Sequence, residues 1–246
     1  MAVKVVSKVE IPELVEKRQS QILRAAIELY GKQGYHVTTI REVALRANVS
    51  VGLIYQYVQD KEDVLFLALV EVLESYQREI PPALAGLTDP MERFCAAVRA
   101  YGHVIDQRIE ATALVYRETK WLRAERRELL KQKEAQTNRL VSDCIGDCMA
   151  AGLFEDLDVD LFTYQIVMFC HAWALKAWHF QGRMTIDEYL DRGMKLMLGP
   201  VLTARGKRNF AQQAPAAPAA AARSGASGGS RVAARSAAGG KRTAAR

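Results

Sequence analysis

Hydrophobic side chains recur at helical spacing through nearly the whole of this chain of 246 residues. In the first such segment Ile22, Ala26 and Leu29 lie on one helical face, Pro12 marks a start and Gly34 marks an end. The alternation typical of strands is confined to a few residues near the N-terminus. The pattern therefore predicts an all-α protein.

Capping residues divide the following stretch into helices. Thr38 and Thr39 precede a short helix, Ser50 precedes a second, and Asp60 begins a longer one with Asp63 as its capping acid. Two prolines, at positions 81 and 82, are expected to end that longer helix. The remaining helices are predicted over residues 91–108, 110–120, 124–151, 158–182 and 185–199.

The two short helices, residues 39–46 and 50–57, are joined by a tight turn, which is the layout of a helix-turn-helix. Asn48 lies in the turn, where a left-handed backbone is needed and asparagine tolerates it. The positions predicted to face inward are Ile40, Val43, Ala44, Val49, Ile54 and Val58. A generic three-helix packing unit is the alternative, but it leaves the outward face of the second helix unexplained.

That outward face carries no charge. On a helical wheel Gly52 and Gln56 lie opposite Ile54, and Leu53 and Tyr55 flank them. Leucine and tyrosine exposed beside glycine are unusual for a solvated helix, but they suit one that enters a DNA groove. Gly52 permits close approach, Gln56 can pair with an adenine edge, and Leu53 can contact a thymine methyl group.

Phosphate contacts are predicted around this face, because most protein–DNA hydrogen bonds go to phosphate or sugar. The candidates are hydroxyl groups, cations and helix starts near the turn. They are Thr39, Arg41, Arg46, Ser50, Tyr55, Tyr57 and Lys61. The predicted partner is double-stranded DNA.

Charge is unevenly distributed along the chain. The formal net charge is +6, yet residues 205–246 contain nine Lys or Arg and no acid, and the middle of the chain is acidic. This tail is built of Ala, Gly, Ser, Pro and Arg, so it cannot offset its ordering entropy by burial and is predicted to be disordered. A non-specific nucleic-acid-binding protein driven by the tail is therefore an alternative, which truncation after Ala204 would test.

The segment "TTIREVALRANVSVGLIYQYVQDKEDVL", together with "ILRAAIELYGKQGY" before it, resembles the N-terminal domain of the TetR (tetracycline repressor-like) family. The resemblance covers residues 18–67, with Asn48 in place of the usual turn glycine and Val58 in place of the usual phenylalanine. It implies an N-terminal three-helix helix-turn-helix domain plus a C-terminal helical effector-binding and dimerisation domain.

The resemblance also implies a homodimer that pairs through its last two helices, an effector pocket among the middle helices, and release from operator DNA when the effector binds. Most members are repressors, and an activator is the alternative. The predicted regions are an N-terminal arm (1–16), the DNA-binding domain (17–62), the effector and dimerisation domain (63–204) and the tail (205–246).

The effector region carries a second resemblance. "YRETKWL", and the spacing of tryptophans before "GR" between Trp173 and Arg183, are similar to regulators that answer to acyl-CoA thioesters and fatty acids. The candidate effector-binding residues are Tyr116, Arg117, Lys120, Trp121 and Trp173. Solvated salt bridges are the simpler interpretation of the charged stretch. His171 and His179 are assigned to the core or an interface.

Other functions lack their motifs. No HExxH, GxSxG, P-loop or glycine-rich dinucleotide turn occurs, so no catalytic residue, cofactor or metal is predicted, and an enzyme or carrier has no nucleophile–base pair. Cys144 and Cys148 share a helical face and are predicted to be buried, with a redox or metal pair as the alternative. No apolar run is long enough for a membrane span, and the charged N-terminus is unlike a secretory signal, which favours a cytoplasmic protein.

Overall fold

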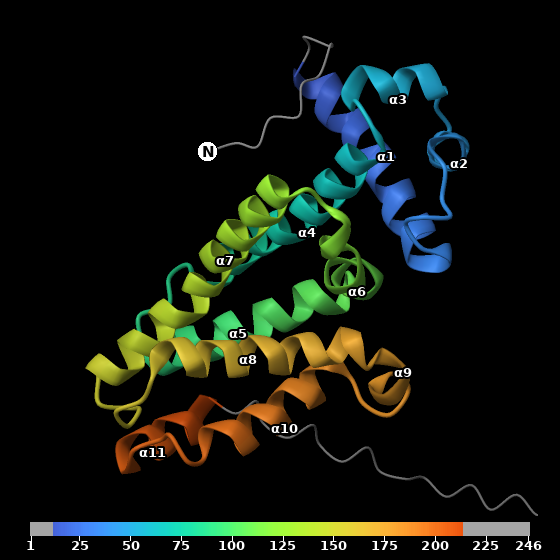
Figure 1. Cartoon of the computed structure of the whole chain (residues 1–246). Coiled ribbons are helices and arrows are strands. Elements are labelled where there is room, and N and C mark those ends of the chain that lie inside the picture. The colour runs from blue at the N-terminus through green and yellow to red at the C-terminus, as the bar shows by residue number, and fades with distance from the viewer. Residues whose placement is uncertain (1–11, 214–246) are drawn as a thin grey trace, which may run out of the picture. The chain divides into compact units, whose positions relative to one another are not determined.

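The structure is a computed structural model that describes residues 12–213, with side chains from residue 18 onward. Within this range it contains eleven α-helices and one short 3-10 helix, η1 (Figure 1). The elements are α1 (Pro12–Gln33), α2 (Ile40–Arg46), α3 (Val51–Tyr57), α4 (Lys61–Leu84), α5 (Pro90–Asp106), α6 (Ile109–Glu118), η1 (Thr119–Trp121), α7 (Ala124–Ala150), α8 (Val159–Leu175), α9 (Ala177–Phe180), α10 (Ile186–Leu198) and α11 (Ala204–Gln213). The all-α prediction is confirmed, since extended residues pair in this range at one isolated bridge.

The predicted caps start the helices of the N-terminal region. Thr39 and Asp60 each form a capping box with an acid three residues later, and Ser50 accepts a hydrogen bond from the Leu53 amide at 3.1 Å. Asn48 has φ 51°, the left-handed conformation expected for the turn. Local side chains therefore satisfy the amides that each helix start leaves unpaired.

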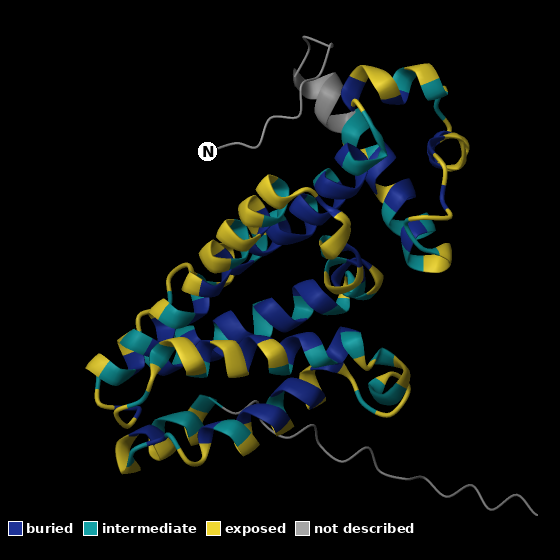
Figure 2. Ribbon diagram, in the orientation of Figure 1, coloured by how far each residue is buried: buried dark blue, intermediate teal, exposed yellow. Residues whose placement is uncertain are grey.

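Two hydrophobic cores share α4. Its first half, including Leu65 and Leu69, packs with α1, α2 and α3 in the N-terminal core. Its second half, including Tyr76 and Ile80, packs with α5, α7, α8 and α10 in the C-terminal core. Buried residues run along both α4 and α5 in Figure 2. The predicted boundary after residue 62 therefore falls inside a continuous helix.

Pro81 and Pro82 do not end α4, contrary to the prediction, because the helix continues to Leu84. A proline removes one amide donor from a helix, and its ring crowds the preceding turn. Here both prolines lie in the last turn, and the Ala85 amide closes the end by bonding to the Pro82 carbonyl at 3.2 Å. The cost is confined to a helix end that is already losing its regular hydrogen bonds.

The prediction of a single helix over residues 158–182 is also wrong. The helix is interrupted at Lys176, which has φ −122° and ψ 29°. α8 ends at Leu175 and a single turn, α9, follows before Gly182. Trp173 is buried on one side of the break, whereas Trp178 is 78% exposed on the other. None of the helices within residues 12–213, the apolar α8 included, has the length and hydrophobicity needed to cross a membrane.

The folded region extends further at its C-terminal end than predicted. α1 starts at Pro12, as predicted, so the predicted N-terminal arm (1–16) overlaps its first turn. α11 occupies the start of the predicted tail because Gly206 packs so closely that an added Cβ would lie 2.0 Å from the Leu153 carbonyl oxygen. Asn209 also bonds to Asp89 at 3.1 Å. The disorder predicted beyond residue 213 lies outside the described residues, and a truncation test of the tail belongs after α11.

Candidate nucleic-acid interface and ligand cavities

α3 presents an uncharged outward face. Gly52, Tyr55 and Gln56 are exposed, whereas Ile54 on the opposite side is 0% exposed. A Cβ added at Gly52 would meet nothing closer than the Ser50 hydroxyl at 4.0 Å, so packing within the domain does not require glycine there. Leu53 is half-buried and partly packed on the N-terminal core. The residues predicted to read DNA thus lie together, with Leu53 the least accessible.

Tyr57, predicted to contact phosphate, is instead a core residue. It is 1% exposed and packs in the N-terminal core with Ile54 and Val58. The physical reason is its register, because Tyr57 lies three residues after Ile54 and therefore on nearly the same helical face. Tyr55, which is 47% exposed, remains available on the surface.

The predicted cations differ in how strongly the fold engages them. Arg46 forms an ion pair with Glu28 of α1. Lys61 donates to the His36 carbonyl at 3.0 Å, and its partial burial lowers the pKa of its ammonium group. Arg41 is exposed, and within residues 18–213 it forms no ion pair. Arg41 is therefore the predicted cation that is best placed to meet an external anion.

Two of the predicted hydroxyl contacts, Thr39 and Ser50, are exposed N-caps. The Thr39 hydroxyl donates to the Glu42 carboxylate at 2.8 Å, so its hydrogen is already used. The Ser50 hydroxyl accepts from a backbone amide and keeps its own hydrogen for an outside acceptor.

Two exposed hydrophobic residues near this face were missed by sequence reasoning. Leu45 on α2 is 82% exposed, and Val37 before α2 is 70% exposed. Leu45 lies one turn from Arg41, outside the inward stripe of its helix. An apolar side chain that departs from the inward pattern was the available signal, and both residues join the candidate interface.

An inner cavity of about 230 Å³ lies among α4, α5, α6, α7 and α8, the middle helices in which the family resemblance implies a pocket. Apolar atoms form most of its wall. Its lining residues are Val72, Leu73, Tyr76, Tyr101, Thr112, Val115, Tyr116, Thr119, Glu134 and His171. No Lys or Arg is among them.

Three tyrosine hydroxyls converge on His171 at one end of this cavity. Nδ1 lies 2.6 Å from the Tyr116 hydroxyl, and Nε2 lies 3.3 Å from that of Tyr101 and 3.4 Å from that of Tyr76. Burial lowers the pKa of His171 to about 4, so its imidazole is neutral near pH 7. His171 is buried, as predicted, but its place in a cavity wall was missed because four helices supply the cluster.

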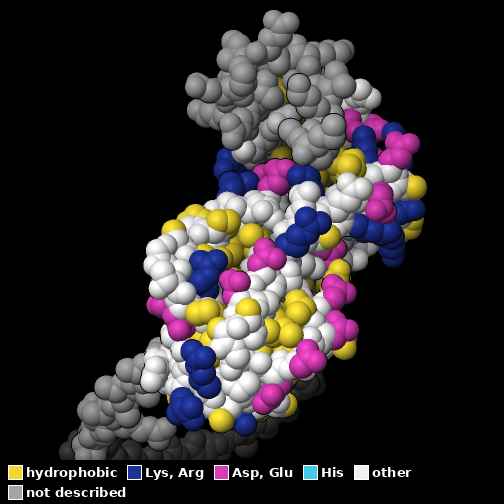
Figure 3. Space-filling view, turned by 90° about the vertical axis from the view of Figure 1, so that its left-hand side faces the viewer, with side chains coloured by type: hydrophobic (Ala, Val, Ile, Leu, Met, Phe, Trp, Pro, Cys, Tyr) yellow, Lys and Arg dark blue, Asp and Glu magenta, His cyan; other side chains and the backbone are white. Residues whose placement is uncertain are grey.

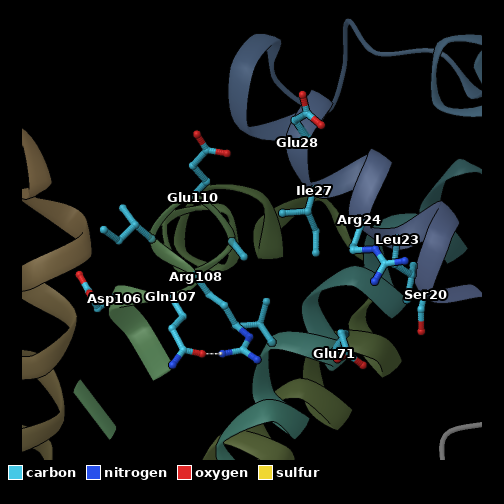
Figure 4. A pocket seen from close by; sticks show the side chains of 13 residues that line it. Ser20, Leu23, Arg24, Ile27, Glu28, Glu71, Asp106, Gln107, Arg108 and Glu110 are labelled. Carbon is cyan, nitrogen blue, oxygen red and sulfur yellow. Dashed lines mark hydrogen bonds between the residues drawn. The ribbon is translucent and has the colours of Figure 1, made fainter. Parts of the chain in front are cut away.

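An outer cavity of about 670 Å³ lies between α1, α4 and the connection from α5 to α6 (Figure 4). Arg24 reaches it from α1, and Arg108 lies beside Gln107, to which it donates at 3.2 Å. Arg108 also forms an ion pair with Glu79 at 2.5 Å. Acidic residues outnumber cations in the wall of this outer cavity. The acidic residues are Glu28, Glu71, Asp106 and Glu110.

Among the predicted effector residues, Tyr116 lines the inner cavity and Trp173 does not. Trp173 is 2% exposed, and its indole donates to the Asp106 carboxylate at 2.7 Å. Its large ring packs in the C-terminal core, where it stacks on Phe180. This side chain therefore belongs to the packing that surrounds the cavity.

Arg117, Lys120 and Trp121 point towards the N-terminal region instead of the inner cavity, because they follow Tyr116 at the end of α6 and in η1. Arg117 donates to the Tyr30 carbonyl at 3.1 Å. Trp121 packs edge-on against His36 with ring centroids 4.1 Å apart. The Lys120 ammonium lies 5.1 Å from the centre of the Trp121 ring. The interpretation of this charged stretch as an effector contact is not supported by its placement.

Comparison with known proteins agrees with both parts of the fold. Residues 22–68 match the family of bacterial regulatory proteins, tetR family, and residues 87–201 match the tetracyclin repressor-like C-terminal domain. The HTH-type transcriptional regulator HbdR of Aromatoleum sp. is 50% identical over 201 residues, which are 82% of this chain and 88% of HbdR. The chain belongs to the TetR family of transcriptional regulators.

Solved structures of other TetR-fold proteins have the same arrangement of helices. The ketosteroid transcriptional regulator KstR2 of Mycobacterium tuberculosis superposes with a TM-score of 0.64 at 20% identity, covering 81% of this chain and 100% of KstR2. AibR, solved in complex with isovaleryl coenzyme A and operator DNA, superposes with a TM-score of 0.64 at 19% identity, covering 73% of this chain and 97% of AibR. At these identities the likeness concerns the fold.

TetR-family membership confirms that the chain is a DNA-binding regulator and not an enzyme.

The four cysteines, Cys95, Cys144, Cys148 and Cys170, are buried, as predicted for Cys144 and Cys148. Burial raises the pKa of the Cys144 thiol to about 11 and that of Cys148 to about 12. Protonated, buried thiols behave as small hydrophobic side chains, which favours packing over a redox or metal role.

In this TetR-family protein the connection from α6 to α7 also touches the start of α4. Arg123 forms ion pairs with Asp60 at 2.8 Å and with Glu62 at 2.9 Å. Arg126 pairs with Glu62 at 3.4 Å and with the buried Asp63. Because Asp60 and Asp63 form the capping box of α4, these ion pairs join the start of α7 to the first turn of α4.

Proposed function

We propose that this protein is a ligand-responsive repressor that binds two-fold operator DNA as a homodimer and leaves it when an acyl-CoA thioester binds. The observation that carries the proposal is the uncharged, exposed face of α3. Gly52, Tyr55 and Gln56 are free on that face, with Arg41 exposed on the preceding helix. A face that combines close approach with hydrogen-bonding groups suits the major groove.

Two copies are needed to read a two-fold site, and α8 supports pairing. Leu161, Tyr164 and Met168 are 60%, 43% and 44% exposed, and their spacing places them along one side of the helix. Leu196 on α10 is 80% exposed. The face of the molecule in Figure 3 has hydrophobic side chains in separate patches between charged ones. The dimer is therefore proposed to form through the exposed sides of α8 and α10.

The effector is proposed to occupy the inner cavity and to act through α6. One side of α6 lines this cavity with Thr112 and Tyr116, and its end contacts α1 through the Arg117 bond to the Tyr30 carbonyl. A ligand that shifts α6 therefore shifts the domain that carries α3. AibR, whose structure contains isovaleryl coenzyme A, supports the thioester class by its similar fold.

Footprinting on promoter DNA upstream of the protein's own gene tests the proposal. We expect two protected half-sites whose centres are about 34–36 Å apart or somewhat more. Hexanoyl-CoA, used as the acyl-CoA probe, should remove the footprint. The matched control is a scrambled fragment of equal length at the same moderate salt. Equal affinity for both fragments would contradict the proposed function.

A further inference from the structure

The inner cavity ends in a cluster of hydroxyl groups that bring more hydrogens than His171 can accept. We infer that this end, formed by Tyr76, Tyr101, Tyr116, Thr112 and His171, binds the uncharged carbonyl oxygen of an acyl thioester and discriminates against the free carboxylate. The inference rests on the proposed function, and it names which chemical form of an acyl compound the regulator detects.

The cluster around His171 contains more hydrogen-bond donors than its imidazole can pair. A neutral imidazole has one N–H donor and one acceptor nitrogen, and three phenols bring three O–H donors. Each ring nitrogen takes part in one hydrogen bond, so the contacts around His171 use two of the four hydrogens. Whichever tautomer is present, two phenolic hydrogens remain. When Nδ1 carries the imidazole hydrogen, one of the two is that of Tyr116, and the thioether of Met168, 3.4 Å from the Tyr116 hydroxyl, is a weak acceptor for it.

Thr112 supplies an independent observation. Its side chain is 2% exposed and lines the inner cavity, and its hydroxyl lies near that of Tyr76 without a hydrogen bond of normal length within the described part of the chain. A buried hydroxyl that lacks a well-formed hydrogen bond is unfavourable. A ligand oxygen that accepts from this hydroxyl and from the phenols pairs with donors on the cavity wall, which favours a polar group at this end.

The charge of the wall selects the type of oxygen. His171 is neutral near pH 7, and Glu134 is the acid among the lining residues, with a pKa that burial raises. No lining cation is available to neutralise a carboxylate. Burying an unpaired anion is far more costly than burying a hydrogen-bonded carbonyl. A thioester carbonyl therefore satisfies the donors without the penalty that a fatty-acid carboxylate brings.

The size of the cavity agrees with an acyl end. At about 230 Å³ it is smaller than the ~300–1,000 Å³ typical of complete small-molecule sites. Its apolar wall, which includes Val72, Leu73 and Val115, suits a short hydrocarbon chain. The cavity thus has room for the acyl group and its carbonyl, and too little room for a coenzyme.

Calorimetric titration of the full-length protein with S-ethyl hexanethioate and with hexanoate tests the inference. Both probes carry the same hydrocarbon chain, and they differ in whether the carbonyl end is charged. We expect the thioester to bind about tenfold or more tightly than hexanoate near pH 7. Equal or tighter binding of hexanoate, or no binding of the thioester, would overturn the inference.

Two variants test the donors. Thr112→Val and Tyr116→Phe each remove one hydroxyl and retain the shape of the wall, and each should weaken thioester binding about threefold to tenfold. Tyr35→Phe, at a half-buried residue of the N-terminal core outside the cavity wall, is the matched control and should bind like the wild type. If both cavity variants also bind like the wild type, the donors do not bind the ligand and the inference fails.

The operator footprint separates the two levels of the proposal. A protein that binds its operator specifically but prefers hexanoate retains the proposed function and loses this inference. A protein that lacks sequence preference on DNA loses the proposed function, whichever probe its cavity prefers.

Discussion

The outward face of α3 and the polar end of the inner cavity both present uncharged hydrogen-bonding groups, but water reaches only one of them freely. The groups on α3 come from consecutive turns of one helix and are solvated before DNA arrives. Those of the cavity come from four helices, and the Thr112 hydroxyl among them forms no hydrogen bond of normal length within the described residues. Exposed groups exchange hydrogen bonds to water for hydrogen bonds to DNA, so the net gain in binding free energy is small. Buried donors gain more binding free energy when a ligand acceptor enters the cavity. Binding in the cavity should therefore lose more affinity than binding at α3 when a single hydrogen-bonding atom is removed.

The largest expected effect concerns how α3 is held. Ile54 is 0% exposed, so Ile54→Ala should lower the free energy of unfolding by about 2–5 kcal/mol through lost burial and a residual cavity. Chemical denaturation followed by circular dichroism measures this loss. Leu45→Ala, at a residue that is 82% exposed, is the control and should change stability by about 0.5 kcal/mol or less. Similar losses in both variants would show that α3 is anchored differently.

The next effect concerns the cavity and depends on pH. Burial lowers the pKa of His171 from 6.5 to about 4, so between these values the unfolded chain binds more protons than the folded chain. Stability contributed by this group is therefore lost as the pH falls through that window, by about 3 kcal/mol in total. His171→Gln should flatten this dependence in urea unfolding measured across the window. An unchanged slope would mean that the imidazole is solvated.

A smaller effect separates base reading from phosphate contact on the N-terminal domain. Gln56→Ala should change which operator sequence is preferred, since a bidentate base contact is worth about 1–3 kcal/mol. Arg41→Ala should weaken all sequences similarly and reduce the slope of log affinity against log salt by about 0.9. Lys61→Ala is a less clean test than Arg41→Ala, because the Lys61 ammonium bonds to the His36 carbonyl. The same selectivity profile for the Gln56 and Arg41 variants would remove the distinction.

The smallest effect compares two tyrosines of α3. Tyr55 is 47% exposed and Tyr57 is 1% exposed. Tyr55→Phe should weaken operator binding by about 1 kcal/mol, the net value of one hydrogen bond, and Tyr57→Phe should leave it unchanged. Fluorescence anisotropy with labelled operator DNA measures both. A loss confined to Tyr57→Phe would reverse the assignment of core and surface.

Much of the N-terminal domain was predictable because its determinants are local. Thr39, Ser50 and Asp60 cap helices through side chains only three residues away, and Asn48 adopts the left-handed turn. The assignment of Tyr57 to phosphate was wrong because it rested on the aromatic hydroxyl, whereas helical register places Tyr57 in the core. In α4 the two prolines correctly indicated that a helix end is near. The helix nevertheless continues to Leu84, because prolines are tolerated in its last turn.

The cavity and the end of the fold depended on contacts between distant residues. Arg117 and Trp121 were predicted to contact the effector because they follow Tyr116 in the sequence. In the structure they contact Tyr30 and His36 instead. α11 followed an abrupt change of composition, and its place is explained by Gly206 against the Leu153 carbonyl. Neither contact has a signature in the order of residues.

By itself the sequence determined the all-α fold, the helix-turn-helix and the neutral face of α3, because helical period and capping act over a few residues. Only the tertiary structure decided which residues meet in the cavity. His171 gains its tyrosine partners from α4, α5 and α6, and its neutral state from burial among them. Hydrogen bonding and desolvation at such a site depend on what surrounds each group in space, and spacing along the chain does not record that.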